Sequence, residues 1–278
     1  MTNKKTVGFV TANDGIKLAW EEAGHGVPVI ALAGLTRTMR DFDFVAPHLS
    51  NVRLIRMDAR GRGRSDHAPW QSYNVGQEAA DVLALMDHLE LDRAAVLGTS
   101  RGGLIAMVLA ATVKDRLTGV CLNDIGPVVD RAGLDMIGVH IGRKPGARSY
   151  AEAASVRAIT HPEWDNVPEG RWRAEVERLY TETGDGLVNN YDPALREAFA
   201  AGVASVSDAW PAFDALSGLP LALIRGANSD LLTPETATAM RHRRPDMHFA
   251  EVPGRGHVPW LDEPEALTAI RAWLKDLA

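Results

Sequence analysis

A serine framed by glycines is the first indication of chemistry in this chain. The segment Gly98-Thr99-Ser100-Arg101-Gly102-Gly103 contains the pattern G-x-S-x-G and lies between two apolar runs. Residues 94–97 predict a buried strand, and residues 104–113 predict a helix that is apolar on nearly every face. A sharp turn between such elements lifts a serine hydroxyl above the edge of a sheet, and glycines let the backbone pass close to its neighbours. The pattern therefore predicts that Ser100 is a nucleophile.

A serine hydroxyl attacks poorly unless a base takes its proton and an acid orients that base. His257 lies in a glycine-framed loop just after a strand expected over residues 249–252, and Asp230 lies just after a strand expected over residues 221–225. Both loops leave the carboxyl ends of parallel strands, where open α/β sheets place their sites. We therefore predict His257 as the base and Asp230 as its acid. Asp124, which follows a strand expected over residues 117–122, is the competing acid, and Asp230 would then cap the helix that begins near residue 234.

The negative charge that develops during attack on a carbonyl needs two backbone N–H donors. The expected donors are the residue after the serine and a residue in the loop after the third strand. These are Arg101 and Leu35, with Gly34 allowing the backbone to turn its amide inward. The guanidinium of Arg101 is expected to pair with a buried acid, because an unpaired buried charge is costly; direct contact with an anionic substrate is the alternative.

The elements that must position these groups alternate along the chain. Asn13-Asp14-Gly15 predicts a hairpin turn between strands over 7–11 and 16–21. Further strands are expected over 28–33, 52–57, 94–97, 117–122, 220–226 and 247–252, with helices over 77–91, 104–113, 234–243 and 263–277. This alternation predicts a mainly parallel sheet with helices on both faces.

The pattern changes in the middle of the chain. Residues 128–213 are expected to be mostly helical and to form a cap, or lid, inserted in a core made of residues 1–127 and 214–278. The cap contains Trp164, Trp172 and Trp210, which could either line a substrate pocket or pack the cap's own small core. Further candidate pocket residues are Thr36, Arg37, His140 and Trp260.

Composition limits the classes of function. The chain has 278 residues, of which 46% are hydrophobic and 24% charged, with a net charge of −6, so no basic excess favours nucleic acid as a partner. The run Arg60, Arg62 and Arg64 is expected to be solvated or to form salt bridges in a loop. Cys121 is the single cysteine, which excludes an intrachain disulfide. A polar start without an apolar signal core predicts a cytoplasmic protein that does not bind membranes.

Over almost its whole length the chain resembles the α/β-hydrolase superfamily. The order and spacing of several stretches carry this resemblance: residues 32–35, 58–65, 98–103, 122–127, 226–230 and 256–257. The resemblance implies an eight-stranded α/β-hydrolase fold with a helical cap after the sixth strand. Relatives often carry His-Gly where this chain has Ala33-Gly34, and a small, aromatic or aliphatic residue where it has Arg101.

The expected function is that of a serine esterase or lactonase that works through an acyl-enzyme on a small-molecule substrate. No metal and no organic cofactor are needed for this reaction. The same triad could instead hydrolyse a carbon–carbon bond of a diketone or catalyse perhydrolysis without a cofactor. The alternative outside enzyme function is a ligand receptor built on a hydrolase core. Sequence leaves the oligomeric state and the substrate open, because function resides in the site rather than in the fold.

Overall fold

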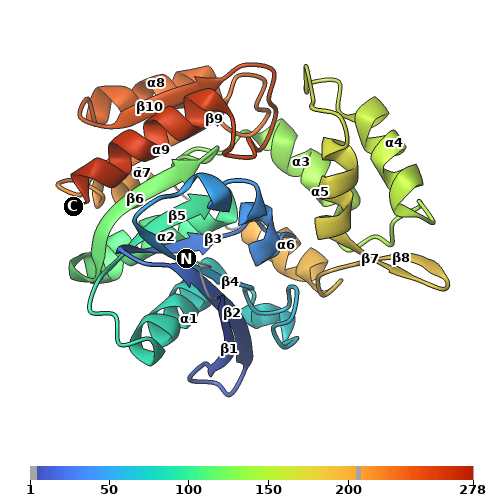
Figure 1. Cartoon of the computed structure of the whole chain (residues 1–278), viewed down its shortest axis with the longest axis horizontal. Helices are drawn as coiled ribbons and strands as arrows, with labels where there is room; N and C mark the ends of the chain where they lie inside the picture. The colour runs from blue at the N-terminus through green and yellow to red at the C-terminus, as the bar shows by residue number, and fades with distance from the viewer. Residues whose placement is uncertain (1–4, 205–207, 278) are drawn as a thin grey trace.

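The strands of the core form one mainly parallel sheet. The structure is a computed structural model that describes residues 5–204 and 208–277; the first residues of the polar start and residues 205–207 of the predicted cap lie outside the described residues. In this part of the chain, one sheet holds eight strands in the order β1-β2-β4-β3-β5-β6-β9-β10 (Figure 1). They are β1 (Thr6–Thr11), β2 (Lys17–Gly24), β3 (Val27–Leu32), β4 (Val52–Met57), β5 (Ala94–Thr99), β6 (Leu117–Asn123), β9 (Leu221–Gly226) and β10 (His248–Val252). The pairs β1–β2, which the predicted hairpin joins, and β2–β4 are antiparallel, and the other neighbouring pairs of this sheet are parallel.

The central strands of the sheet are buried on both faces, which explains why the sequence of β3 is continuously apolar. Ile30 and Leu32 belong to one apolar cluster, whereas Val29 and Ala31 belong to the other. Successive side chains of a strand point to opposite faces, so a strand covered on both sides must be apolar at every position. The sequence prediction of a mainly parallel sheet with helices on both faces is confirmed.

Four long helices of the core cover the two faces. They are α1 (Val75–His88), α2 (Arg101–Val113), α8 (Pro234–Arg243) and α9 (Pro264–Asp276). Helices α1, α2 and α8 pack on one face and α9 on the other. In α9 the buried residues Leu267, Ile270 and Trp273 recur at helical spacing, which places one apolar stripe against the sheet. Short 3₁₀ turns, η1 (Met39–Asp43), η2 (Ala46–His48), η3 (Trp70–Ser72) and η4 (Lys114–Arg116), connect the core elements.

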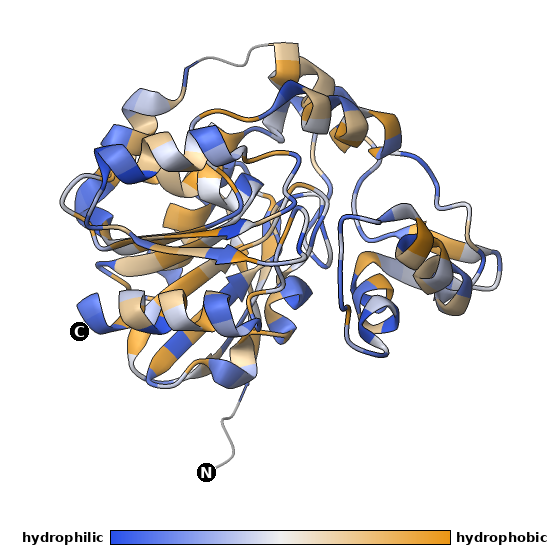
Figure 2. Ribbon diagram, turned by 90° about the horizontal axis from the view of Figure 1, so that it is seen from above, coloured by the Kyte–Doolittle hydropathy of each residue, from blue (hydrophilic) through white to orange (hydrophobic). Residues whose placement is uncertain are grey.

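Most of the segment between β6 and β9, all but its last helix, stands apart from the sheet (Figures 1 and 2). Its elements are α3 (Arg131–His140), α4 (Tyr150–Thr160), α5 (Arg171–Leu179), β7 (Tyr180–Thr183), β8 (Gly186–Asn189), α6 (Leu195–Ala204) and α7 (Trp210–Asp214). The antiparallel β7–β8 hairpin was not anticipated by the sequence analysis. Helix α7 packs against α2, and Phe213 is fully buried in the core cluster. The last part of the predicted cap therefore packs with the core of the molecule.

No helix in residues 5–204 and 208–277 combines the length and the apolar character that crossing a membrane requires.

Candidate active site

Ser100 sits on a strained turn between β5 and α2. Its φ of 49° and ψ of −114° lie outside the regions that residues with a side chain favour, which is typical of a turn held in place by its surroundings. A Cβ added at Gly98 would lie 2.5 Å from the backbone of Gly102, and one added at Gly102 would collide with the carbonyl oxygen of Leu32. Only glycine fits at these two positions, so the G-x-S-x-G pattern is a requirement of close backbone packing.

His257 joins the serine to an acid. It lies in the loop between β10 and α9, where its Nε2 is 2.9 Å from Ser100 Oγ and its Nδ1 is 2.7 Å from Asp124 Oδ2. A neutral imidazole held this way carries its proton on Nδ1 and presents Nε2 as an acceptor for the serine proton. The predicted pairing of Ser100 with His257 is present in the structure.

The acid beside His257 is Asp124, not Asp230. Asp124 follows β6 directly, has a φ of 54° and is completely buried. Its Oδ1 accepts a hydrogen bond from the amide of Gly226 at 2.8 Å, and its Oδ2 accepts one from Ser229 Oγ at 2.6 Å as well as facing His257. Gly226 is the last residue of β9, and Ser229 lies in the loop after it, the loop that also contains Asp230. That loop therefore supports the acid and does not supply it.

Asp230 takes neither of the two roles considered from sequence. Its side chain is exposed, and the N-cap of α8 is Thr233, whose hydroxyl accepts from the amide of Thr236. The prediction of Asp230 as the acid is wrong because β6 and β9 are neighbouring parallel strands. The loops after them meet at one edge of the sheet, and which carboxylate turns toward His257 depends on backbone conformation there. The sequence signal that could have identified Asp124 as the acid is its position directly after β6.

The loop after β3 and the start of α2 carry the two predicted oxyanion donors. A Cβ placed on Gly34 would lie 3.8 Å from Ser100 Cβ, so this loop passes beside the nucleophile. Arg101 is the first residue of α2, where backbone amides have no partner within the helix. Among the described residues, no group of the chain accepts a hydrogen bond from the amide of Leu35 or of Arg101. Both amides remain predicted donors to a substrate oxyanion.

A buried ion network connects these two donor segments. Arg101 Nε donates to Glu78 Oε2 at 2.6 Å, which confirms the expected pairing of this guanidinium with a buried acid. Glu78 Oε1 accepts from Arg62 Nη1 at 2.8 Å, and Arg62 Nε donates to the carbonyl oxygen of Leu35 at 2.8 Å. Burial raises the pKa of Glu78, but Arg62 and Arg101 outweigh that effect and leave its pKa below the ordinary value. Glu78 is therefore ionised, and through Arg101 and Arg62 it links the start of α2 to the loop that contains Leu35.

The arginine run of the sequence is only partly at the surface. Arg60 and Arg62 are fully buried, and Arg60 pairs with Asp81 through two hydrogen bonds of 2.7 and 2.6 Å. These two arginines form salt bridges in a loop, as expected, and their pairing with acids allows both guanidiniums to be buried beside α1. Arg64 is exposed.

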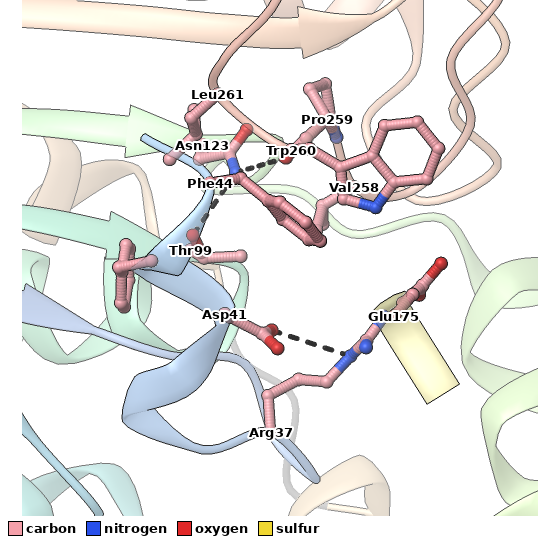
Figure 3. A pocket seen from close by; sticks show the side chains of 11 residues that line it. Arg37, Asp41, Phe44, Thr99, Asn123, Glu175, Val258, Pro259, Trp260 and Leu261 are labelled. Atoms are coloured by element: carbon pink, nitrogen blue, oxygen red, sulfur yellow. Dashed lines mark hydrogen bonds and ion pairs between the residues drawn. The ribbon is translucent and has the colours of Figure 1, made fainter. Parts of the chain in front are cut away.

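A cavity opens beside the triad (Figure 3). The space inside it that water-sized groups can occupy is about 20 Å³, enough for one or two such groups; the open mouth brings the empty space to about 350 Å³. Its lining residues are Arg37, Asp41, Phe42, Phe44, Thr99, Asn123, Glu175, Val258, Pro259, Trp260 and Leu261. Two of the predicted pocket residues, Arg37 and Trp260, belong to this set. The cavity adjoins the catalytic edge, since Thr99, Asn123 and Val258 directly precede or follow the three residues of the triad in sequence.

The other predicted pocket residues lie elsewhere. Trp164 and Trp172 pack against Trp260, with ring centroids 4.3 and 5.8 Å from its ring, so they form the layer behind the cavity wall. Trp210 contacts Phe213 and the guanidinium of Arg243 and packs on the core cluster, so its assignment to the pocket is wrong. The reason is that α7 packs against α2 of the core and not against the cavity. His140 is exposed at the end of α3, and Thr36 is half-buried beside Leu35; neither lines the cavity.

We expect replacement of Trp172 and of Trp210 by alanine to have different consequences. Trp172→Ala removes support from Trp260 and should change the relative kcat/KM across a panel of esters. Trp210→Ala should lower the Tm, by an amount equivalent to about 2–3 kcal/mol for a partly buried tryptophan, and leave the relative kcat/KM unchanged. If both variants only lost stability, the layer behind Trp260 would have no part in substrate choice.

His161 makes this segment sensitive to acid. Burial, together with the charge of Arg157, lowers the pKa of His161 to about 4. An unfolded histidine titrates near 6.5, so between pH 6.5 and 4 the unfolded chain binds the extra proton and stability falls as the pH falls. We expect His161→Asn to reduce the loss of Tm between pH 7 and pH 5 by about 2–4 °C, allowing for partial exposure. His140→Asn, at an exposed site, is the control, and an equal loss in both variants would contradict the assignment.

The chain is similar to known proteins of one family along most of its length. The family model for the alpha/beta hydrolase family matches residues 25–270. A 3-hydroxybutyrate-oligomer hydrolase of Cupriavidus necator is 35% identical over 261 residues, which are 88% of this chain and 87% of that protein. A 3-oxoadipate enol-lactonase of Acinetobacter baylyi is 27% identical over 224 residues, 80% of this chain and 78% of that protein. The crystal structure of an alpha/beta hydrolase from Novosphingobium aromaticivorans superposes with a TM-score of 0.92 at 32% identity, covering 99% of this chain and all of that one.

Proposed function

This chain belongs to the alpha/beta hydrolase family, and we propose that it is a serine hydrolase that cleaves a small-molecule carboxylic ester or lactone through an acyl-enzyme. The observation that carries the proposal is the imidazole of His257, which lies 2.9 Å from Ser100 Oγ and 2.7 Å from Asp124 Oδ2. The relatives support a hydrolase that acts on ester bonds. Because one relative acts on 3-hydroxybutyrate oligomers, these are the first substrates to test.

Each residue of the site has a defined role in this reaction. Ser100 Oγ attacks the ester carbonyl while its proton passes to His257 Nε2, and Asp124 stabilises the imidazolium that forms. The amides of Leu35 and Arg101 donate to the carbonyl oxygen as it becomes negative. The alcohol leaves with the proton from His257, and the acyl group stays on Ser100. Water then gives a proton to His257 and attacks the acyl-enzyme, which releases the acid and restores the serine hydroxyl.

The segment containing α3 to α6 is proposed to act as a lid over this site. The contribution of α5 to the cavity supports the idea, because Glu175 of α5 lines the cavity together with Arg37 from the loop after β3. A lid that supplies part of the pocket can select substrates and exclude water from the acyl-enzyme.

The proposal is tested by turnover. The protein is incubated with a 3-hydroxybutyrate dimer and trimer, a simple lactone and p-nitrophenyl esters, and released acid is counted per molecule of protein. We expect many equivalents of product and a transient mass increase of one acyl group located on Ser100. Release of no more than one equivalent from every substrate would overturn the proposal and favour a ligand receptor.

A further inference from the structure

One end of the cavity is polar, although Phe42 and Leu261, which belong to one of the two apolar clusters of the core, also line it. Its polar wall consists of Arg37, Asp41 and Glu175. Arg37 belongs to the loop after β3; a Cβ placed on Gly34 would lie 3.3 Å from Arg37 Cγ and 3.8 Å from Ser100 Cβ, so the stem of Arg37 runs close to the nucleophile. Glu175 comes from α5, on the other side of the cavity (Figure 3). The polar wall is therefore assembled from two segments that are far apart in sequence.

Only one of the two carboxylate oxygens of Glu175 accepts hydrogen bonds from the protein. Its Oε1 accepts from Arg37 Nη2 at 3.0 Å and from Arg157 Nη2 at 2.8 Å. Its Oε2 is buried and has no hydrogen-bond partner, and the residue as a whole is 2% exposed. A buried polar atom left without a partner is destabilising, so such an atom in a cavity wall indicates that a ligand group completes it.

The protonation state of Glu175 decides which kind of group can do so. Burial raises its pKa, but the positive charges of Arg157 and Arg37 outweigh burial and leave the pKa below its usual value. The side chain is thus ionised near neutral pH, and an ionised carboxylate can only accept hydrogen bonds. The missing partner must be a donor.

The surrounding charges indicate a neutral donor. The positive charges of Arg37 and Arg157 face the carboxylates of Glu175 and Asp41, the latter 3.7 Å from Arg37 Nε, so the wall is already close to charge balance. An ammonium group or a second carboxylate would upset this balance in a buried place, whereas a hydroxyl would not. Of the other lining residues, Phe42, Phe44, Val258, Pro259, Trp260 and Leu261 are apolar and suit the end of a short carbon chain. Thr99 and Asn123 are polar, and Asn123 Oδ1, like Glu175 Oε2, has no hydrogen-bond partner among the described residues.

We propose that this cavity receives the hydroxyl-bearing end of a hydroxyacyl ester, with the free hydroxyl of the substrate donating to Glu175 Oε2. The proposal rests on the proposed function and names its substrate class. It assigns Glu175 as a specificity-determining residue, and Arg37 and Arg157 as the residues that position its carboxylate.

A purely structural role for Glu175, as a fastener of α5 to the core, makes a different prediction. Another ion pair already fastens this helix: Arg171 of α5 donates to both oxygens of Asp262 at 3.0 and 2.6 Å. Asp262 does not line the cavity. Asp262→Asn therefore weakens the attachment of α5 without touching the proposed hydroxyl acceptor, and it is the matched control for Glu175→Gln.

The experiment compares esters of one alcohol that differ only at one position of the acid. The acids are 3-hydroxybutyrate, butyrate, 3-methoxybutyrate and 3-oxobutyrate, and a second set pairs 6-hydroxyhexanoate with hexanoate to test a longer reach. In the wild type we expect kcat/KM to be at least about tenfold higher for the hydroxy ester than for its unsubstituted partner in one of the two sets, with the methoxy ester no better than the unsubstituted one.

Glu175→Gln should reverse the hydrogen-bonding character of the wall. The carbonyl oxygen of the new amide will face the two guanidiniums, which leaves its NH₂ group directed to the cavity as a donor. The hydroxyl preference should then disappear and the 3-oxo ester should gain relative to the 3-hydroxy ester. Asp262→Asn should retain the wild-type preference even if its Tm falls.

Each outcome decides the proposal. Equal kcat/KM for hydroxy and unsubstituted esters in the wild type overturns it, and so does a hydroxyl preference that survives in Glu175→Gln or is lost equally in Asp262→Asn. If Glu175→Gln does not fold, the wild-type ratios still decide. If no ester is turned over at all, the proposed function fails, and calorimetry on Ser100→Ala with 3-hydroxybutyrate against butyrate tests the binding site separately; equal affinities would refute it.

Discussion

Replacing Ser100 with alanine is expected to reduce ester hydrolysis by roughly 10⁵- to 10⁶-fold, because it removes the attacking oxygen while the rest of the site remains. The Tm should change little, since the side chain loses one oxygen and the strained turn is held by the glycines around it. A fluorophosphonate probe should label the wild-type protein and leave the variant unlabelled. Labelling that persists at another serine would disprove the assignment.

A second serine of the site provides the control. Ser229 Oγ lies 2.6 Å from Asp124 Oδ2 and donates to it, so it supports the acid without facing the substrate. Ser229→Ala should keep probe labelling at Ser100 and lose about tenfold in kcat, in line with the loss of one hydrogen bond to a charged group. A complete loss of labelling in Ser229→Ala would show that the nucleophile had been misassigned.

Asp124→Asn is expected to lower kcat by about 10⁴-fold. The asparagine keeps the shape of the acid but can no longer stabilise the imidazolium, and its amide can impose the wrong tautomer on His257. Asp230→Asn is the matched control on the neighbouring strand end, and it should stay within about threefold of the wild type because Asp230 is exposed and lies outside the contacts of His257. The measurement is kcat on a single good ester, with the Tm of both variants recorded.

The opposite ranking of the two variants would mean that the loop after β9 rearranges during the reaction and brings Asp230 to His257. Equal, small losses would mean that neither carboxylate orients the imidazole. Both results would contradict the geometry in which Asp124 accepts hydrogen bonds from Gly226 and Ser229 while facing His257.

The order of strands and helices and the position of the nucleophile could be predicted from sequence because both depend on local patterns. Continuous apolar runs such as β3 predict strands buried on both faces. The glycines around Ser100 report a backbone so close to its neighbours that no side chain fits. His257 could be found because it follows a strand in a glycine-framed loop. Each of these features is encoded within a few consecutive residues.

The burial of Arg60 and Arg62 could not be predicted in the same way. Arg62 is charged and lies in a loop, which suggests contact with solvent, yet it is 1% exposed because Glu78 of α1 and the carbonyl oxygen of Leu35 accept hydrogen bonds from its guanidinium. Trp210 and Trp172 belong to the same tryptophan-bearing segment, but α7 packs on the core while α5 faces the cavity. Residues distant in sequence determine both the burial of Arg62 and the different surroundings of the two tryptophans.

The sequence by itself determined the family, the sheet and the candidate nucleophile and base, since each is encoded by local periodicity or by residues required at one tight turn. Only the tertiary structure decided the acid and the polar wall of the cavity. Asp124 and Asp230 both follow strands that are neighbours in the sheet, and the left-handed backbone at Asp124 turns its carboxylate toward His257. Glu175 meets Arg37 across 138 residues of chain. Such pairings depend on how separate segments pack, and no local pattern in the sequence specifies them.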